Sequence, residues 1–154
     1  MPGTLQSFLA DAAHKAAIDL ETALMRLPED KRSWSAGGDA RSAIDMVAEC
    51  AILGGSTAQT IEDHAFPSDF DFARYAGEKD ELSQNVEATL ALLHENAARV
   101  ADAIRAVPDE NLEVKVQMPW GPMTLTQLMS YPQWNMAYHE GQINFIASIL
   151  GCLK

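Results

Sequence analysis

The sequence has 154 residues, of which 47% are apolar and 21% charged, values typical of a globular chain and unlike those of a disordered one. Its 22 acidic residues outnumber its 11 Lys and Arg residues, which leaves a net charge near −11 and no basic stripe for a phosphate backbone. We therefore expect one domain over residues 1–154 that binds no nucleic acid. No apolar run approaches the roughly 18 residues of a membrane span, so we also expect a cytoplasmic protein that does not insert into membranes.

The first half of the chain predicts two helices. Apolar residues recur at spacings of three and four from Leu5 to Leu27 and Pro28 ends the pattern, which indicates a helix over 4–27. Asp39 is a candidate N-cap for a second helix, over 40–63. Gly54 and Gly55 interrupt the apolar stripe of this second helix, so we expect either a close helix crossing or a kink there.

A long connection and a third helix follow. The polar stretch at 64–81 carries several aromatic residues, and a connection of this length is expected to fold over one end of the molecule. From Leu82 to Val107 apolar residues follow a heptad-like stripe that ends at Pro108, which predicts a buried helix face. The residues of this stripe that we expect to be buried are Leu82, Val86, Leu90, Leu93, Val100 and Ile104.

The last part of the chain predicts an extended connection and a fourth helix. Apolar and polar residues alternate over 112–118 and are followed by prolines and a glycine, which favours a hairpin-like segment. Thr124 and Gln127 have the spacing of a capping box that begins a helix, Pro132 should bend it, and Gly151 ends it. Four helices with long connections predict an all-α, antiparallel four-helix bundle.

Three polar residues lie on the inward faces of these helices. Asn135 and His139 are one turn apart on the inward face of the last helix, and Glu49 lies at the edge of the buried stripe of the 40–63 helix. A buried carboxylate needs a metal, a protonated His, an Arg or hydrogen bonds. Two interpretations stay open: a metal site formed by Glu49, Asn135 and His139, or a hydrogen-bonded network that fixes one helix against the other.

Residues 134–151, WNMAYHEGQINFIASILG, resemble the last helix of the DinB/YfiT-like family of bacterial four-helix bundles, in which a His is followed by Gly-Gln-Ile. Here these residues are His139, Gly141, Gln142 and Ile143. The segments RSAIDMVAECA and MPWGPMTL are similar to the family's second helix and to its connection before the last helix. The resemblance implies the same bundle over the whole chain.

Family members that bind a divalent metal use three histidines, and this sequence keeps only His139. Asn135 stands at the position of the second histidine, and Glu49 aligns with the first. The resemblance implies a Zn, Ni or Mn enzyme, either a thiol transferase that uses a low-molecular-weight thiol such as bacillithiol or mycothiol, or a hydrolase. It also implies a homodimer. The alternative is a non-catalytic, stress-related or small-molecule-binding bundle in which these residues form a structural polar network. A direct hydrogen bond between Glu49 and His139 would favour the alternative.

Overall fold

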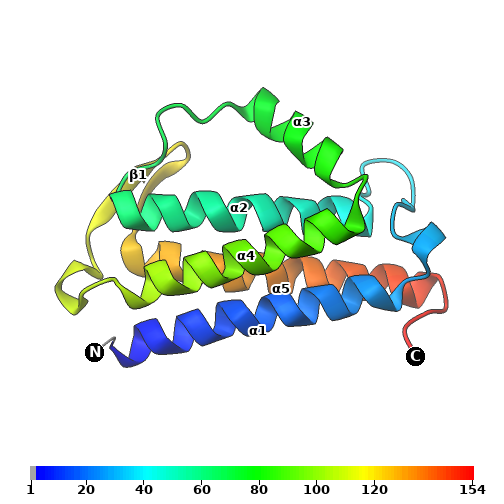
Figure 1. The fold of residues 1–154 in the computed structure, drawn as a ribbon, viewed down its shortest axis with the longest axis horizontal. Helices are drawn as coiled ribbons and strands as arrows, with labels where there is room; N and C mark the ends of the chain where they lie inside the picture. The colour runs from blue at the N-terminus through cyan, green and yellow to red at the C-terminus, as the bar shows by residue number, and fades with distance from the viewer. Residues whose placement is uncertain (1–2) are drawn as a thin grey trace.

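Four long helices make up most of the computed structural model, which describes residues 3–154 (Figure 1). They are α1 (Thr4–Arg26), α2 (Ala43–Asp63), α4 (Val86–Arg105) and α5 (Leu125–Ile149). A shorter helix, α3 (Phe72–Leu82), lies over α2, and short 3₁₀ turns occur at Glu29–Lys31 and Asp109–Asn111. An antiparallel hairpin of β1 (Lys115–Met118) and β2 (Gly121–Thr124) precedes α5. The four-helix bundle predicted from the sequence is confirmed.

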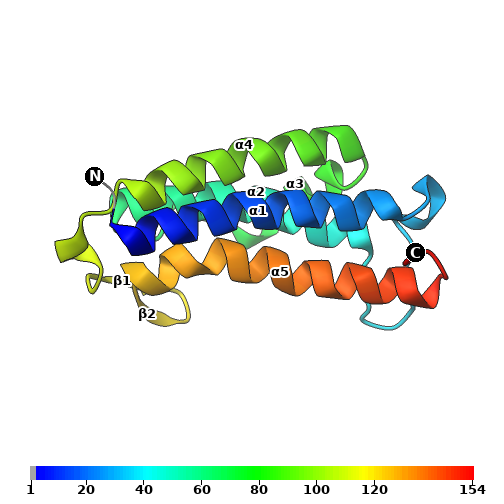
Figure 2. The same cartoon turned by 90° about the horizontal axis from the view of Figure 1, so that it is seen from below.

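The order of the helices follows from the path of α3. Helix α1 packs beside α4 and α5, and α2 packs beside the same two helices on the opposite side of the core. Because α3 carries the chain back along the bundle, α2 and α4 run in the same direction, as do α1 and α5 (Figures 1 and 2). The antiparallel neighbours are therefore α1 with α4 and α2 with α5. The second of these pairs brings together the residues singled out in the sequence.

Side-chain caps set the helix starts. The Ser42 hydroxyl accepts a hydrogen bond from the backbone of Asp45, so α2 begins three residues later than predicted and Asp39 does not cap it. The predicted capping box of Thr124 and Gln127 is present at the start of α5. In the connection, Asp71 caps α3, a helix that the sequence pattern did not reveal because none of its residues is buried.

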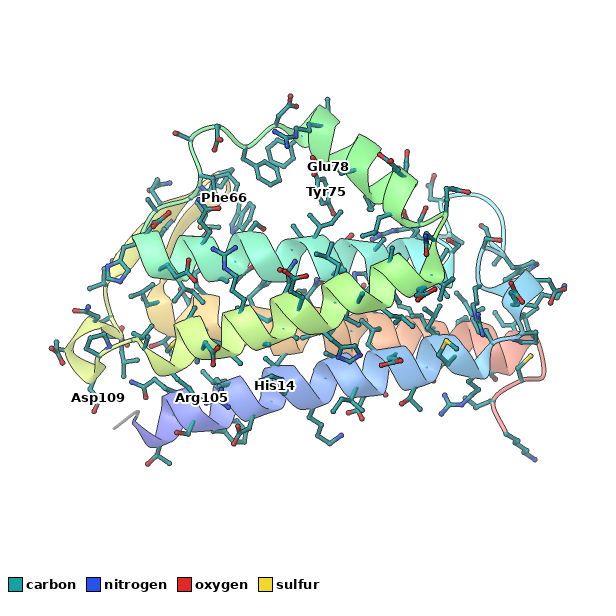
Figure 3. All side chains as sticks on the ribbon, in the orientation of Figure 1. His14, Phe66, Tyr75, Glu78, Arg105 and Asp109 are labelled. Carbon is teal, nitrogen blue, oxygen red and sulfur yellow. The ribbon has the colours of Figure 1, made fainter. Side chains whose placement is uncertain are left out.

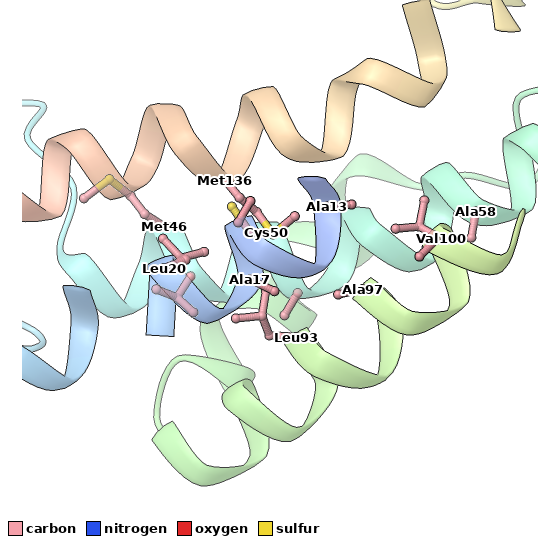
Figure 4. Close-up of a cluster of buried hydrophobic side chains, with 14 of the residues drawn as sticks. Ala13, Ala17, Leu20, Met46, Cys50, Ala58, Leu93, Ala97, Val100 and Met136 are labelled. Atoms are coloured by element: carbon pink, nitrogen blue, oxygen red, sulfur yellow. The ribbon is translucent and has the colours of Figure 1, made fainter. Parts of the chain in front are cut away.

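The core lies between the four long helices and is formed largely by small and aliphatic side chains (Figure 4). Leu93, Val100 and Ile104 are buried as predicted. The burial expected for Leu82, Val86 and Leu90 is wrong in degree: these residues are half-buried at the edge of the core. Leu82 ends α3 and so cannot extend the buried stripe of α4, whose first residue is Val86.

The glycine pair of α2 marks a close helix crossing. A Cβ atom added to Gly54 would lie 3.2 Å from the Cβ of Asn96 on α4, and one added to Gly55 would lie 2.9 Å from its Nδ2. The same Asn96 amide donates a hydrogen bond to the carbonyl of Ala51 at 2.7 Å. Of the two outcomes expected for this pair, the crossing is the one found. Within residues 3–154, no helix has both the length and the apolarity needed to cross a membrane.

Candidate functional site

Glu49 and His139 meet in the interface between α2 and α5. The His139 Nε2 and Glu49 Oε1 atoms are 3.0 Å apart, and the two side chains are 7% and 16% exposed, respectively. His139 was predicted on the inward face of its helix and Glu49 at the edge of the buried stripe, and the antiparallel packing of α2 and α5 brings them to the same level. A direct contact of this kind was the observation expected to favour a polar network.

Arg41 supplies the positive charge beside Glu49. It lies in the segment before α2, and its guanidinium Nη1 is 2.6 Å from Glu49 Oε2. Its Nε is 2.5 Å from Asp45 Oδ2, and the other oxygen of Asp45 pairs with Lys79 of α3 at 2.9 Å. A chain of alternating charges therefore runs from α3 across α2 to α5. Each oxygen of Glu49 has its own partner within this chain.

The other ring nitrogen of His139, Nδ1, also has a close partner. This atom is 2.6 Å from Gln142 Oε1, one turn further along α5. Both ring nitrogens thus face side-chain oxygens, those of Glu49 and Gln142. Neither nitrogen can ligate a metal unless one of these contacts breaks.

The charge of Glu49 is stabilised by its partners. Burial on its own would raise the pKa of Glu49, but the hydrogen bond with His139 and the charge of Arg41 outweigh that effect and lower the pKa to about 2. Glu49 is therefore a carboxylate over the whole physiological pH range. A group held so firmly in its ionised form is a poor general base, because it has little affinity for a proton.

Asn135, the third predicted site residue, is buried but stands apart from this chain of charges. Its side-chain amide contacts the Sγ atom of Cys50 at 3.5 Å. Burial, the larger cause, and the nearby Glu49 carboxylate together raise the pKa of the Cys50 thiol far above its usual range. The structure brings Glu49 and His139 into contact, whereas Asn135 pairs with the neighbouring thiol.

The residues at this position do not suit a divalent metal as they are arranged. A catalytic zinc site usually offers three protein ligands, of which this position provides one imidazole and one carboxylate. Both groups already have close partners, so a metal ion could reach the Glu49 oxygens only by displacing Arg41 or His139 from them. Nowhere in residues 3–154 does a group of three His, Cys, Asp or Glu side chains have the arrangement needed to hold a metal ion.

A cleft of about 320 Å³ opens next to Glu49, between α2, α3, the hairpin and α5. Figure 3 shows Tyr75 extending from α3 toward α2, with Phe66 nearer to the hairpin. Six aromatic side chains line this space: Phe66, Phe70, Phe72, Tyr75, Trp120 and Tyr131. The aromatic residues of the connection, expected to cover one end of the bundle, form a side wall of this cleft instead, because α3 runs along α2.

The negative charge of Glu49 acts on the two tyrosines of the cleft, Tyr75 and Tyr131. Burial and the Glu49 carboxylate raise the pKa of Tyr131 to about 12, and the same two causes raise the pKa of Tyr75 further still. Both phenols therefore keep their protons at neutral pH and remain hydrogen-bond donors. They add two polar groups to a cleft with mostly apolar walls.

Arg41 and helix α3 belong to this site but were not predicted from the sequence to be part of it. A signal for Arg41 was present, since Asp45 and Glu49 follow it at intervals of four residues and therefore share one face of a helix. Gln142 was noted only as part of the family-like string. Trp120 lines the cleft, whereas Trp134 is 56% exposed and stacks on Tyr138.

Comparisons of the sequence with protein-family models and with curated proteins find no match. Comparison with solved structures finds YfiT from Bacillus subtilis, described as a probable metal-dependent hydrolase with an unusual four-helix bundle topology. The two chains superpose with a TM-score of 0.79 at 14% identity, over 95% of this chain and 87% of YfiT. At this identity the likeness establishes the fold, which agrees with the DinB/YfiT-like resemblance of the sequence. The chain is a four-helix bundle of the YfiT type.

Proposed function

We propose that this protein binds a small organic molecule in the aromatic cleft, and that Glu49, held in place by Arg41 and His139, forms part of the wall of the site without a metal. The observation that carries the proposal is the cleft itself, which has about 320 Å³ and includes the partly buried carboxylate of Glu49 in its lining. Ligand sites in proteins typically have roughly 300 to 1,000 Å³, mostly apolar walls and a few convergent polar groups. The cleft has all three properties.

The network offers a reason why Glu49 and Asn135 stand at two positions where metal-binding members of the resembled family have histidines. In this proposal Arg41 provides a fixed positive charge beside Glu49, and the hydrogen bond between His139 and Glu49 holds α5 against α2. The arrangement needs no ion to satisfy its buried charges, because each charged group already faces one of opposite sign or an oxygen acceptor.

A binding measurement tests the proposal. The neutral fluorophore N-phenylnaphthylamine should gain fluorescence with the protein and accept energy from Trp120, which lies in the cleft. Leu53→Trp should abolish this binding, because Leu53 lines the cleft and a larger side chain would fill it. The matched control is Gln59→Trp, which adds the same side chain at an exposed position of the same helix. Equal binding by the two variants would refute the proposal.

The second candidate is a metal-dependent hydrolase or thiol transferase, supported by the YfiT-type fold and by the adjacency of Glu49 and His139. An ion could bind only if one of the two contacts of the His139 ring, with Glu49 or with Gln142, were exchanged for a metal–ligand bond. Metal content of the purified protein, followed by titration with zinc, nickel and manganese, separates the candidates. One equivalent of bound metal that disappears in His139→Gln would favour this second function.

A further inference from the structure

Glu49 is the one charged residue among those that line the cleft. Its partners Arg41 and His139 approach it from outside the cleft, and neither contributes to the lining. A molecule in the cleft would therefore meet a carboxylate and not the cations that balance it. After burial, which raises the pKa of Tyr75 most, the charge of Glu49 raises it more than the charge of Arg41 lowers it, in agreement with a negative potential in this space.

The aromatic side chains of the cleft form a connected group. Phe66 contacts Phe70 with ring centroids 5.2 Å apart and Trp120 at 6.3 Å, in an edge-on arrangement. Phe70 also contacts Tyr75 at 5.9 Å. The faces of aromatic rings carry partial negative charge, so several rings around one space attract a cation that has shed its water. Such a group beside a carboxylate is the usual construction of a site for alkylated ammonium ions.

The segment that forms one side of the cleft is acidic as well. Residues 62–81, which include most of α3, contain seven acidic and two basic residues. Both basic residues are already paired, Arg74 with Glu78 and Lys79 with Asp45. With a net charge of −11, the molecule as a whole attracts cations and repels anions.

We propose that the ligand of the cleft is an organic cation of the alkylammonium class, with its charged group beside Glu49 and its apolar part among the aromatic rings. The inference rests on the proposed binding function and adds the chemical class of the ligand. A neutral apolar molecule would gain the contact with the rings but not the attraction of Glu49. An anion would be repelled by the faces of the aromatic rings and by Glu49.

Two probes of the same shape but different charge show how much the charge contributes to binding. We would measure by calorimetry the binding of meta-hydroxyphenyltrimethylammonium and of meta-tert-butylphenol, in which a carbon replaces the charged nitrogen. At slightly acidic pH both phenols keep their protons, while Glu49 remains ionised. The cation should bind at least about tenfold more tightly than its neutral counterpart, and the difference should shrink as salt is added.

The outcomes are distinct for the two proposals. Equal affinity of the two probes, or preference for the neutral one, would overturn the cation inference and leave the binding function intact. Failure of both probes and of N-phenylnaphthylamine would overturn the binding function, and the inference with it.

Variants then locate the effect. Glu49→Gln should reduce the affinity for the cation about tenfold and change that for the neutral probe by less than about twofold. Trp120→Leu should also reduce the affinity for the cation more than that for the neutral probe. Trp120 is 66% exposed, so its replacement should not disturb folding. The control Phe145→Leu removes an equally exposed aromatic ring, 68% exposed, on α5 outside the cleft. Loss of cation binding in Phe145→Leu to the same extent would contradict the assigned position.

Discussion

At the scale of single residues, the ionisation of Glu49 gives the clearest test of the network. Its pKa is lowered from an ordinary value of 4.5 to about 2, so it stabilises the fold above about pH 4.5 and loses this effect as the pH falls toward 2. Glu49→Gln should therefore reduce the free energy of unfolding by on the order of 2 kcal/mol at neutral pH. Urea unfolding across pH should show the difference from wild type shrinking below pH 4.5.

The control for this prediction is Glu78→Gln. Glu78 pairs with Arg74 on the surface of α3, where solvent screens the interaction, so its loss should change the free energy of unfolding little at any pH. A constant difference between wild type and Glu49→Gln at all pH values would mean that the charge of Glu49 does not contribute to stability.

Leu93 tests the packing of the core. It is 1% exposed, and its replacement by Ala should reduce the free energy of unfolding by about 2–5 kcal/mol through lost contacts and the cavity left behind. Leu90→Ala, at a half-buried position one turn earlier, should cost less. Equal losses for the two variants would show that the deeper burial of Leu93 does not increase its contribution to stability.

At the scale of the helices, the crossing of α2 and α4 can be tested by a double-mutant cycle. Gly55→Ala should destabilise the protein, because the added methyl group would displace Asn96 from its hydrogen bond with Ala51. In an Asn96→Ala background the same change should stabilise it by up to about 1 kcal/mol, since Ala is the better helix former. The control is Gly77→Ala in α3, where a new Cβ atom meets nothing within 4 Å. Additive effects of Gly55→Ala and Asn96→Ala would contradict the contact.

The elements also show what the sequence could and could not reveal. The four long helices were predictable because each has an apolar stripe with stop or cap signals, as at Pro108 and Thr124. Helix α3 was missed because it has no buried face. Two of three predicted site residues meet because their helices are antiparallel neighbours. The cleft could not be predicted, because it depends on where α3 and the hairpin lie relative to α2.

At the scale of the whole molecule, net charge governs which partners can approach. With a charge of −11, the protein should show no binding to a fluorescently labelled DNA duplex by anisotropy, even at low salt. A basic control protein should bind the same duplex. Tight binding by this chain that weakens steeply with salt would reveal a local basic surface that its overall composition conceals.

The two free cysteines give the molecule a reporter of its own motion. Cys50 is buried beside Glu49 and Asn135, whereas Cys152 is half-buried near the end of the chain. A thiol reagent should therefore modify Cys152 quickly in the native protein, and Cys50 only when α2 and α5 separate transiently, because the buried thiol resists ionisation. Mass spectrometry of the two peptides would follow both rates in one sample, with Cys152 as the internal standard. A ligand seated against Glu49 should slow the modification of Cys50 alone. Similar rates for the two cysteines would mean that this part of the helix interface is open to the reagent most of the time.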